Sequence, residues 1–227
     1  MLHINISKQQ TQIVLMHEPF SPVIPKLVEL LGKFPQYFSQ IPQIMPQPTN
    51  SVSLPIVSLC SIKEEKETEK NEFILFFNDK IVFSLCYNNW TLDFIKSVIK
   101  EITQINGENF KLKQIVVQSK VYAPYERNAM QDLLQHIKLQ QAICDKDSLQ
   151  DIGMSLRYHL SYQDKNVLAS YQVRTVSIGK GKPTTDAPNA LCIFQSFLLQ
   201  NTKDIQAVQF VDFAEQTRKE RIEAFKQ

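Results

Sequence analysis

The sequence predicts an α+β protein built from two tandem halves, each with the order strand, helix, three strands, helix (βαβββα). Two observations support this prediction. The order of apolar patterns over residues 1–106 recurs over residues 109–227, and most apolar runs have the length and flanking turn residues of antiparallel strands. Because the connection at Gly107 is short, we expect the halves to pack as one body, with mainly antiparallel sheets and helices on one face.

The first half opens with a strand over residues 11–17. A helix is then expected near Ser21, a candidate N-cap, because Pro22 suits the first helical position. Apolar residues recur at helical spacing until Phe34, and the following Pro35 ends the helix.

Prolines shape the next part of the chain. Residues 41–48 contain three prolines, too many for a helix or a central strand, and we expect an extended segment that runs over the surface. Residues 52–62 predict a strand whose Pro55 indicates an edge position or a bulge. Residues 63–72 carry charges of both signs and predict a solvated loop.

A β-hairpin should follow, with strands over residues 72–77 and 80–87 and a turn at residues 78–79. The next helix begins after Thr91, a candidate N-cap, and stops at Gly107. Its apolar residues share one face and should be buried. They are Leu92, Ile95, Val98, Ile99, Ile102 and Ile105.

The second half is expected to follow the same order. A strand over residues 110–122 precedes a helix whose inward side includes Met130 and Ile137. Residues 155–163 and 167–178 alternate apolar and polar side chains, which is typical of half-buried antiparallel strands. A strand over 190–199 and a terminal helix complete the chain. The apolar stripe of that helix contains Phe210, Phe213, Ala214, Thr217, Ala224 and Phe225.

The hairpin of the second half contains the first candidate site. A two-residue turn at Lys165-Asn166 would place Arg157 opposite Arg174, with His159 beside them, on the polar face. Two facing guanidinium groups need a counter-charge, which predicts a site that binds an anion or an acidic partner. The alternative is a solvated face on which both arginines reach nearby carboxylates.

A glycine-rich loop offers a second candidate for anion binding. Lys180 and Lys182 alternate with Gly179 and Gly181, and glycine backbone N–H groups together with lysines suit a phosphate. The loop lacks the spacing of a Walker motif and of a dinucleotide-binding fingerprint. An ordinary flexible hairpin loop explains the same residues.

No catalytic residue, metal site or cofactor is predicted from the sequence. The cysteines are not arranged in metal-binding or redox pairs, and the histidines are far apart. Three cysteines lie inside apolar runs, which favours thiols over a disulfide framework. The residues concerned are Cys60, Cys86, Cys144, Cys192, His3, His17, His136 and His159.

Composition points to a globular cytoplasmic protein. The chain is 43% hydrophobic and 21% charged, it has neither a long apolar run nor a signal peptide, and we expect no membrane association. The net charge is +2, and all five arginines lie in the second half, where an anionic partner is expected to bind. That excess alone is too small to predict nucleic-acid binding.

A family resemblance covers mainly residues 11–105. It rests on the Phe34-Pro35 stop, the IPQIMPQP segment, the IVS strand and the FILFFNDKIVFSLC hairpin followed by a helix. In these features the chain resembles a sporadically distributed family of uncharacterised bacterial proteins of similar length. The resemblance implies a cytoplasmic bacterial or phage-associated α+β protein and supplies no catalytic residues.

These observations favour a non-enzymatic binding or adaptor protein that engages a protein partner, for example as an immunity, antitoxin or phage-defence component. The alternative is a protein that binds or processes nucleic acid through the basic residues of the second half. A basic groove on the folded surface would favour nucleic acid, whereas an exposed apolar patch would favour a protein partner. The sequence does not predict the oligomeric state.

Overall fold

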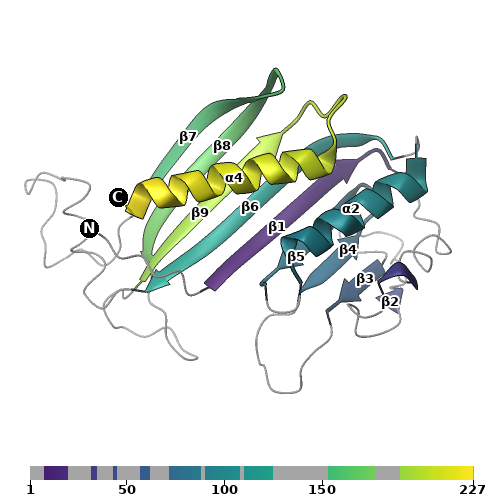
Figure 1. The fold of residues 1–227 in the computed structure, drawn as a ribbon, viewed down its shortest axis with the longest axis horizontal. Coiled ribbons are helices and arrows are strands. Elements are labelled where there is room, and N and C mark those ends of the chain that lie inside the picture. The colour runs from purple at the N-terminus through teal and green to yellow at the C-terminus, as the bar shows by residue number, and fades with distance from the viewer. Residues whose placement is uncertain are drawn as a thin grey trace, which may run out of the picture.

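A computed structural model describes residues 8–19, 32–34, 43–44, 57–61, 72–87, 90–107, 110–124, 153–176 and 190–226. Within these residues the chain is a mixed α/β protein in which nine strands form a single antiparallel sheet beside two long helices (Figure 1). Neither helix is long and apolar enough to cross a membrane.

The sheet draws its strands from both parts of the chain. The elements are β1 (Lys8–His17), β2 (Gln43–Ile44), β3 (Val57–Cys60), β4 (Phe73–Phe76), β5 (Lys80–Leu85), α2 (Leu92–Asn106), β6 (Leu112–Pro124), β7 (Gly153–Tyr162), β8 (Lys165–Val176), β9 (Ala190–Leu199) and α4 (Ala207–Lys226). Across the sheet the strand order is β2-β3-β4-β5-β1-β6-β9-β8-β7, with β1 and β6 paired at the centre. Of the helix predicted near Ser21, only residues 32–34 are described. The helix predicted around Met130 lies outside the described residues.

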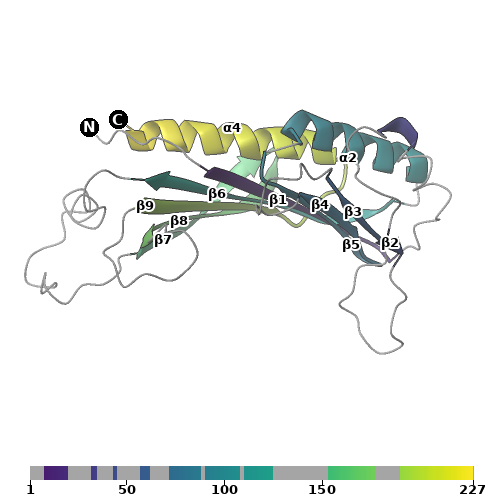
Figure 2. The ribbon, with the colours of Figure 1, turned by 90° about the horizontal axis from the view of Figure 1, so that it is seen from below.

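The two layers of the molecule follow from the alternation of side chains along each strand. In β1, Ile13 and Leu15 are buried while Gln12 and Val14 between them are half-buried. The buried set packs against α2 and α4 in one apolar core, and Figure 2 shows both helices on that side of the sheet. One face of the sheet is therefore the core face, and the other is turned away from the helices.

Helix α2 forms where its sequence pattern predicts it. Thr91 caps the helix, because its hydroxyl accepts the N–H of Phe94 at 3.1 Å, and Gly107 ends it with a φ of 53° that glycine tolerates without strain. Ile95, Ile99 and Ile102 are buried, as expected from their spacing.

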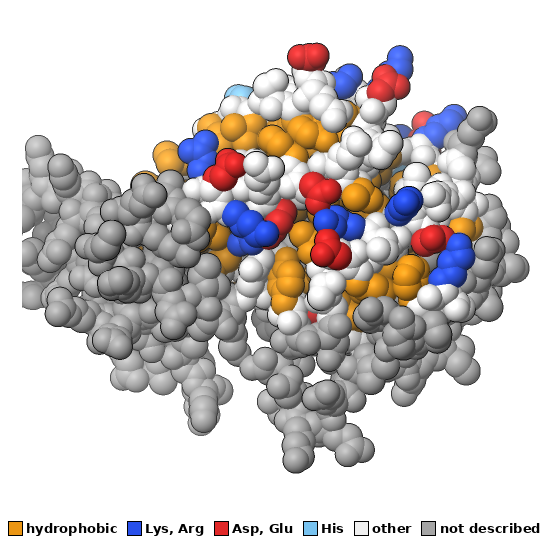
Figure 3. Space-filling model, in the orientation of Figure 1, with side chains coloured by type: hydrophobic (Ala, Val, Ile, Leu, Met, Phe, Trp, Pro, Cys, Tyr) orange, Lys and Arg blue, Asp and Glu red, His pale blue; other side chains and the backbone are white. Residues whose placement is uncertain are grey.

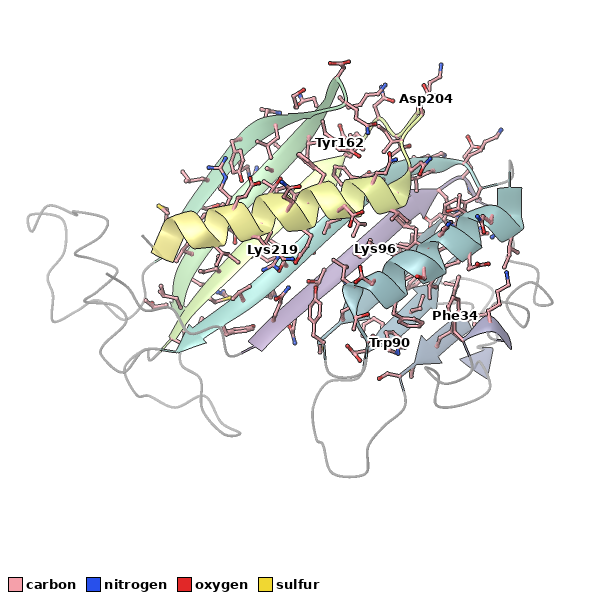
Figure 4. All side chains as sticks on the ribbon, viewed as in Figure 1. Phe34, Trp90, Lys96, Tyr162, Asp204 and Lys219 are labelled. Carbon is pink, nitrogen blue, oxygen red and sulfur yellow. The ribbon has the colours of Figure 1, made fainter. Side chains whose placement is uncertain are left out.

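Side-chain contacts hold the two helices together. Lys96 of α2 lies 2.8 Å from Asp212 of α4 and 2.6 Å from Asp93 on its own helix. Figure 4 shows Lys96 between the two helices. The hydrogen bonds to Asp212 and Asp93 raise the pKa of Lys96, so this cross-helix contact persists at neutral pH.

The proline segment joins the sheet. Gln43 and Ile44 pair with Ser58 and Val57 as a two-residue edge strand. The segment is extended at these two residues as predicted, but here it forms the edge of the sheet rather than running over its surface, because strand β3 leaves an edge free to pair.

The register of the second-half hairpin differs from the predicted one. The turn residues are Gln163 and Asp164, with φ values of 46° and 58°, whereas Lys165 and Asn166 are already paired in β8. Two residues with positive φ match the right-handed twist of a tight hairpin. The pairing is therefore displaced by four residues, and because four is even, every side chain stays on its predicted face.

Candidate functional site

The sheet face opposite the helices is the candidate site, and we call it the open face. Among the described residues, no helix or strand lies on it (Figure 2). In the same view the sheet is twisted rather than flat. A partner could approach the open face without displacing a described element.

The strand registers arrange the open-face side chains in rows that run across the sheet. Three neighbouring rows form what we call the polar zone. The first runs through Tyr122, Cys192 and Arg174. The second contains Gln10, Lys120, Phe194, Gln172 and Ser155. The third contains Ser84, Gln12, Gln118, Ser196, Ser170 and Arg157.

The polar zone is hollowed at its centre. A depression of about 500 Å³ lies over β1, β6, β9 and β8. Its open-face lining residues are Gln10, Gln12, Ser84, Gln118, Lys120, Gln172, Arg174, Cys192 and Phe194. Amide groups dominate this lining, and each amide can both donate and accept hydrogen bonds.

Charge is segregated between the two faces of the sheet. At open-face strand positions whose side chains the structure describes, the charged residues are all basic, and none is Asp or Glu. They are Lys80, Lys120, Arg157 and Arg174. The helices instead mix both signs, and acidic and basic side chains lie next to each other on their surface (Figure 3).

No described carboxylate pairs with the basic side chains of the polar zone. Lys120, Arg157 and Arg174 are exposed, and no ion pair joins any of them to a described carboxylate. The alternative interpretation, in which nearby carboxylates neutralise the arginines, therefore finds no support in the described part of the chain.

Tyr122 stays protonated beside this charge. Burial is the largest cause that raises the pKa of Tyr122, and the neighbouring Cys192 raises it further, against the opposing effect of Arg174. The phenol is thus a neutral hydrogen-bond donor at the rim of the polar zone.

The structure separates the predicted arginine pair. Arg157 lies opposite Ser170, and Arg174 lies opposite Gly153, so the two arginines share a face but do not oppose each other. Four positions of strand separate them, about 13 Å along the sheet. The predicted cross-strand contact is wrong, because the turn forms two residues earlier than expected.

The remaining predicted site residues lie apart from the arginines. His159 lies opposite Leu168, and its Nδ1 is 2.8 Å from Asn166 Oδ1. Lys180 and Lys182 are outside the described residues. The five candidate residues therefore do not form one described cluster.

Sequence reasoning missed the centre of the site. Gln10 and Gln12 alternate with Thr11 and Ile13, which shows that they share a face of β1. The signal that could have found the site is the run of polar residues at 9–12 of β1 and at 118–120 of β6. Its meaning depends on the pairing of β1 with β6, which no local pattern specifies.

An apolar row borders the polar zone. It crosses six strands through Leu75, Val82, Val14, Val116, Leu198 and Leu168. Leu168 is 39% exposed, whereas Val82 is only 8% exposed. The open face therefore combines a polar, basic region with a narrow apolar one.

Comparisons with known proteins do not assign the chain to a family. No family model matches it, and no curated protein matches it. A rolling circle replication initiator protein from Geobacillus stearothermophilus is a weak structural neighbour, with 9% identity and a TM-score of 0.27 over 87% of this chain and 74% of that one. A TM-score this low does not establish a shared fold.

The described residues offer little for metal chemistry. No three His, Cys, Asp or Glu side chains within them gather closely enough to hold a metal ion. Cys60, Cys86 and Cys192 are thiols rather than disulfides. The chemistry that the open face can perform is recognition, by hydrogen bonds from amides, positive charge and aromatic contact.

Proposed function

We propose that the open face binds nucleic acid. The single observation that carries this proposal is the segregation of charge, since the described strand positions of the open face carry only basic charged residues around a central depression, which is complementary to a polyanion. The surface of the two helices instead mixes acidic and basic side chains, so it lacks this single sign of charge (Figure 3).

The polar zone supplies the other groups that nucleic acids need. Lysine and arginine contact phosphates and position the chain. Gln10, Gln118 and Gln172 provide paired donors and acceptors that suit base edges. Phe194 adds an aromatic surface within the same depression.

The number of basic residues sets the expected strength of binding. Lys120, Arg157 and Arg174 can neutralise about three phosphates, which predicts that the logarithm of affinity falls with the logarithm of salt with a slope of about −2 for a single strand. Binding should thus be moderate at low salt and weak at physiological salt.

The test uses fluorescence anisotropy with labelled oligonucleotides at low salt. The double variant K120Q/R174Q should bind less tightly than the wild type and show a shallower salt slope. The matched control is K100Q/K219Q, which removes the same charge from the exposed helix surface and should bind like the wild type apart from a small uniform loss. Equal losses in the two double variants would overturn the proposal, because they would reflect net charge alone.

A protein partner is the second candidate, and the apolar row favours it. An adaptor or immunity-type protein would cover Leu168 and Leu198 and leave the basic groups at the rim. The variant L168S should then weaken the complex recovered from the native host while K120Q/R174Q changes it little. If K120Q/R174Q weakens the complex and L168S changes it little, a protein partner at the apolar row is excluded.

The finer fold prediction is also a proposal. We propose that the chain consists of two βαβββα halves that share one sheet. The strand order β3-β4-β5-β1 in the first half and β7-β8-β9-β6 in the second supports this duplication. Cytoplasmic residence and a role without a cofactor belong to the same proposal. An experimental structure should place a helix between β1 and β2 and another between β6 and β7.

A further inference from the structure

We infer that Phe194 stacks on an unpaired base, so that the nucleic acid bound by the open face is single-stranded. This inference rests on the proposed function and specifies its substrate. It starts from the position of one side chain whose orientation is unusual for its strand.

Phe194 is an aromatic residue surrounded by polar ones. It lies opposite Lys120 on β6 and Gln172 on β8, and Cys192 and Ser196 flank it on its own face of β9. Among the residues that line the depression it is the aromatic one. Its ring is half-buried, so part of it remains available to a ligand.

The neighbouring residue shows that this arrangement is costly. Gln195 points to the core face and is 2% exposed, and neither its Oε1 nor its Nε2 has a hydrogen-bond partner among the described residues. At this point of β9 the amide is inside and the aromatic ring is outside, the reverse of what folding favours. Departures from the folding pattern concentrate at functional sites.

The geometry favours a single strand over a duplex. A duplex presents phosphates and groove edges on its outside, whereas its base faces are stacked internally, so a ring in a depression can contact only an unstacked base. Sheet faces that carry exposed aromatic residues between basic groups bind single strands by this kind of stacking.

The basic residues lie around Phe194 at spacings that suit a chain of phosphates. Arg174 lies two strands and two residues from Lys120, about 12 Å away across the sheet. One phosphate cannot bridge that distance, but two phosphates of one strand can. Gln172 lies beside the ring on the neighbouring strand, where it can reach the edge of the stacked base.

The experiment compares F194L with the wild type and with F73L, using anisotropy with a labelled ten-nucleotide oligodeoxythymidine and with the same strand annealed to its complement. Phe73 is a half-buried aromatic on the open face that does not line the depression, so F73L is the matched control. F194L should weaken single-strand binding roughly 5- to 100-fold, leave the salt slope unchanged, and leave duplex binding unchanged. F73L should bind like the wild type.

A second variant guards against loss of folding. F194W keeps an aromatic ring, so it should retain single-strand affinity, and its fluorescence should be quenched when the oligonucleotide binds. Trp90 is buried, so its fluorescence provides a constant background signal. Thymidine monophosphate alone should bind far more weakly than the oligonucleotide, because it contacts only one basic group.

The outcomes separate the two claims. The stacking inference is wrong if F194L binds single strand like the wild type while K120Q/R174Q loses binding. It is also wrong if F194L weakens the binding of duplex and of single strand equally. In both cases the proposed function stands. If the wild type binds no oligonucleotide, or K120Q/R174Q changes nothing beyond its helix-face control, both claims fall and a protein partner becomes the remaining candidate.

Discussion

At the scale of single residues, the most informative side chain is Gln195. A buried amide without partners lowers stability, because its hydrogen bonds to water are lost on folding and not replaced. Ser119, its neighbour across the sheet, is buried in the same way, and within the described part of the chain its Oγ also lacks a hydrogen-bond partner. Nothing in the one-dimensional pattern of β9 predicts this, since Gln195 would be assigned to the surface by polarity alone.

We therefore expect Q195M, which has nearly the same shape, to leave stability unchanged or to raise it. The control is T11V in the same row of the core face, where the Thr11 hydroxyl lies 2.8 Å from the Tyr87 hydroxyl. T11V should cost about 0.5–1.5 kcal/mol. Urea unfolding of both variants measures this. A larger loss of unfolding free energy in Q195M than in T11V would show that the Gln195 amide forms hydrogen bonds in solution.

A second residue-scale prediction concerns His17. Its ring is 2% exposed, burial lowers its pKa below the ordinary value of 6.5, and its Nδ1 lies 2.7 Å from the Glu18 carbonyl oxygen. The folded state prefers the neutral ring, so the stability that His17 confers is present above pH 6.5 and is lost as the pH falls through that value.

The unfolding free energy of the wild type should therefore decline from about pH 7.5 to about pH 5, a window of about 2.5 pH units that includes that value. The unfolding free energy of H17Q should decline less steeply with falling pH. That of H159Q, which replaces an exposed histidine, should decline as in the wild type. A wild-type slope retained in H17Q would mean that another group titrates in this range.

At the scale of elements, the sequence predicted helix α2 and hairpin strands well, because local chemistry determines them. The Thr91 cap, the isoleucine spacing and Gly107 act within one helix, and no distant contact overrides them. The β7–β8 register was not predictable in the same way. Two registers that differ by four residues place the same side chains on the buried face of the sheet, so hydrophobic alternation cannot distinguish between them.

The turn chooses the register, which gives a test of the hairpin. Asp164 has a positive φ, so D164G should raise stability by up to about 1 kcal/mol. N166G should instead lower it by about 1 kcal/mol, because Asn166 is a strand residue and contacts His159. If the urea midpoints rank the two variants in the opposite order, the turn forms at Lys165-Asn166 as the sequence predicted.

At the scale of the whole molecule, the candidate site exists only because both parts of the chain share one sheet. The polar zone takes Gln10 and Gln12 from β1, Lys120 from β6, and Phe194 and Gln172 from β9 and β8. Strand pairing over such sequence distances depends on tertiary packing, which local patterns do not encode. Global composition hides the same fact, since a net charge of +2 does not show on which face of the sheet the basic residues lie.

The central claim is that the open face, and not the helix face, contacts nucleic acid. The most direct test is ultraviolet crosslinking of the full chain to a single-stranded oligonucleotide that contains 4-thiothymidine, followed by mass spectrometry of the peptides. We predict adducts on open-face residues of the central strands, foremost Tyr122 and Phe194, and their loss when unlabelled single strand competes. Adducts confined to α2 and α4, or an absence of competable adducts at low salt, would contradict the claim.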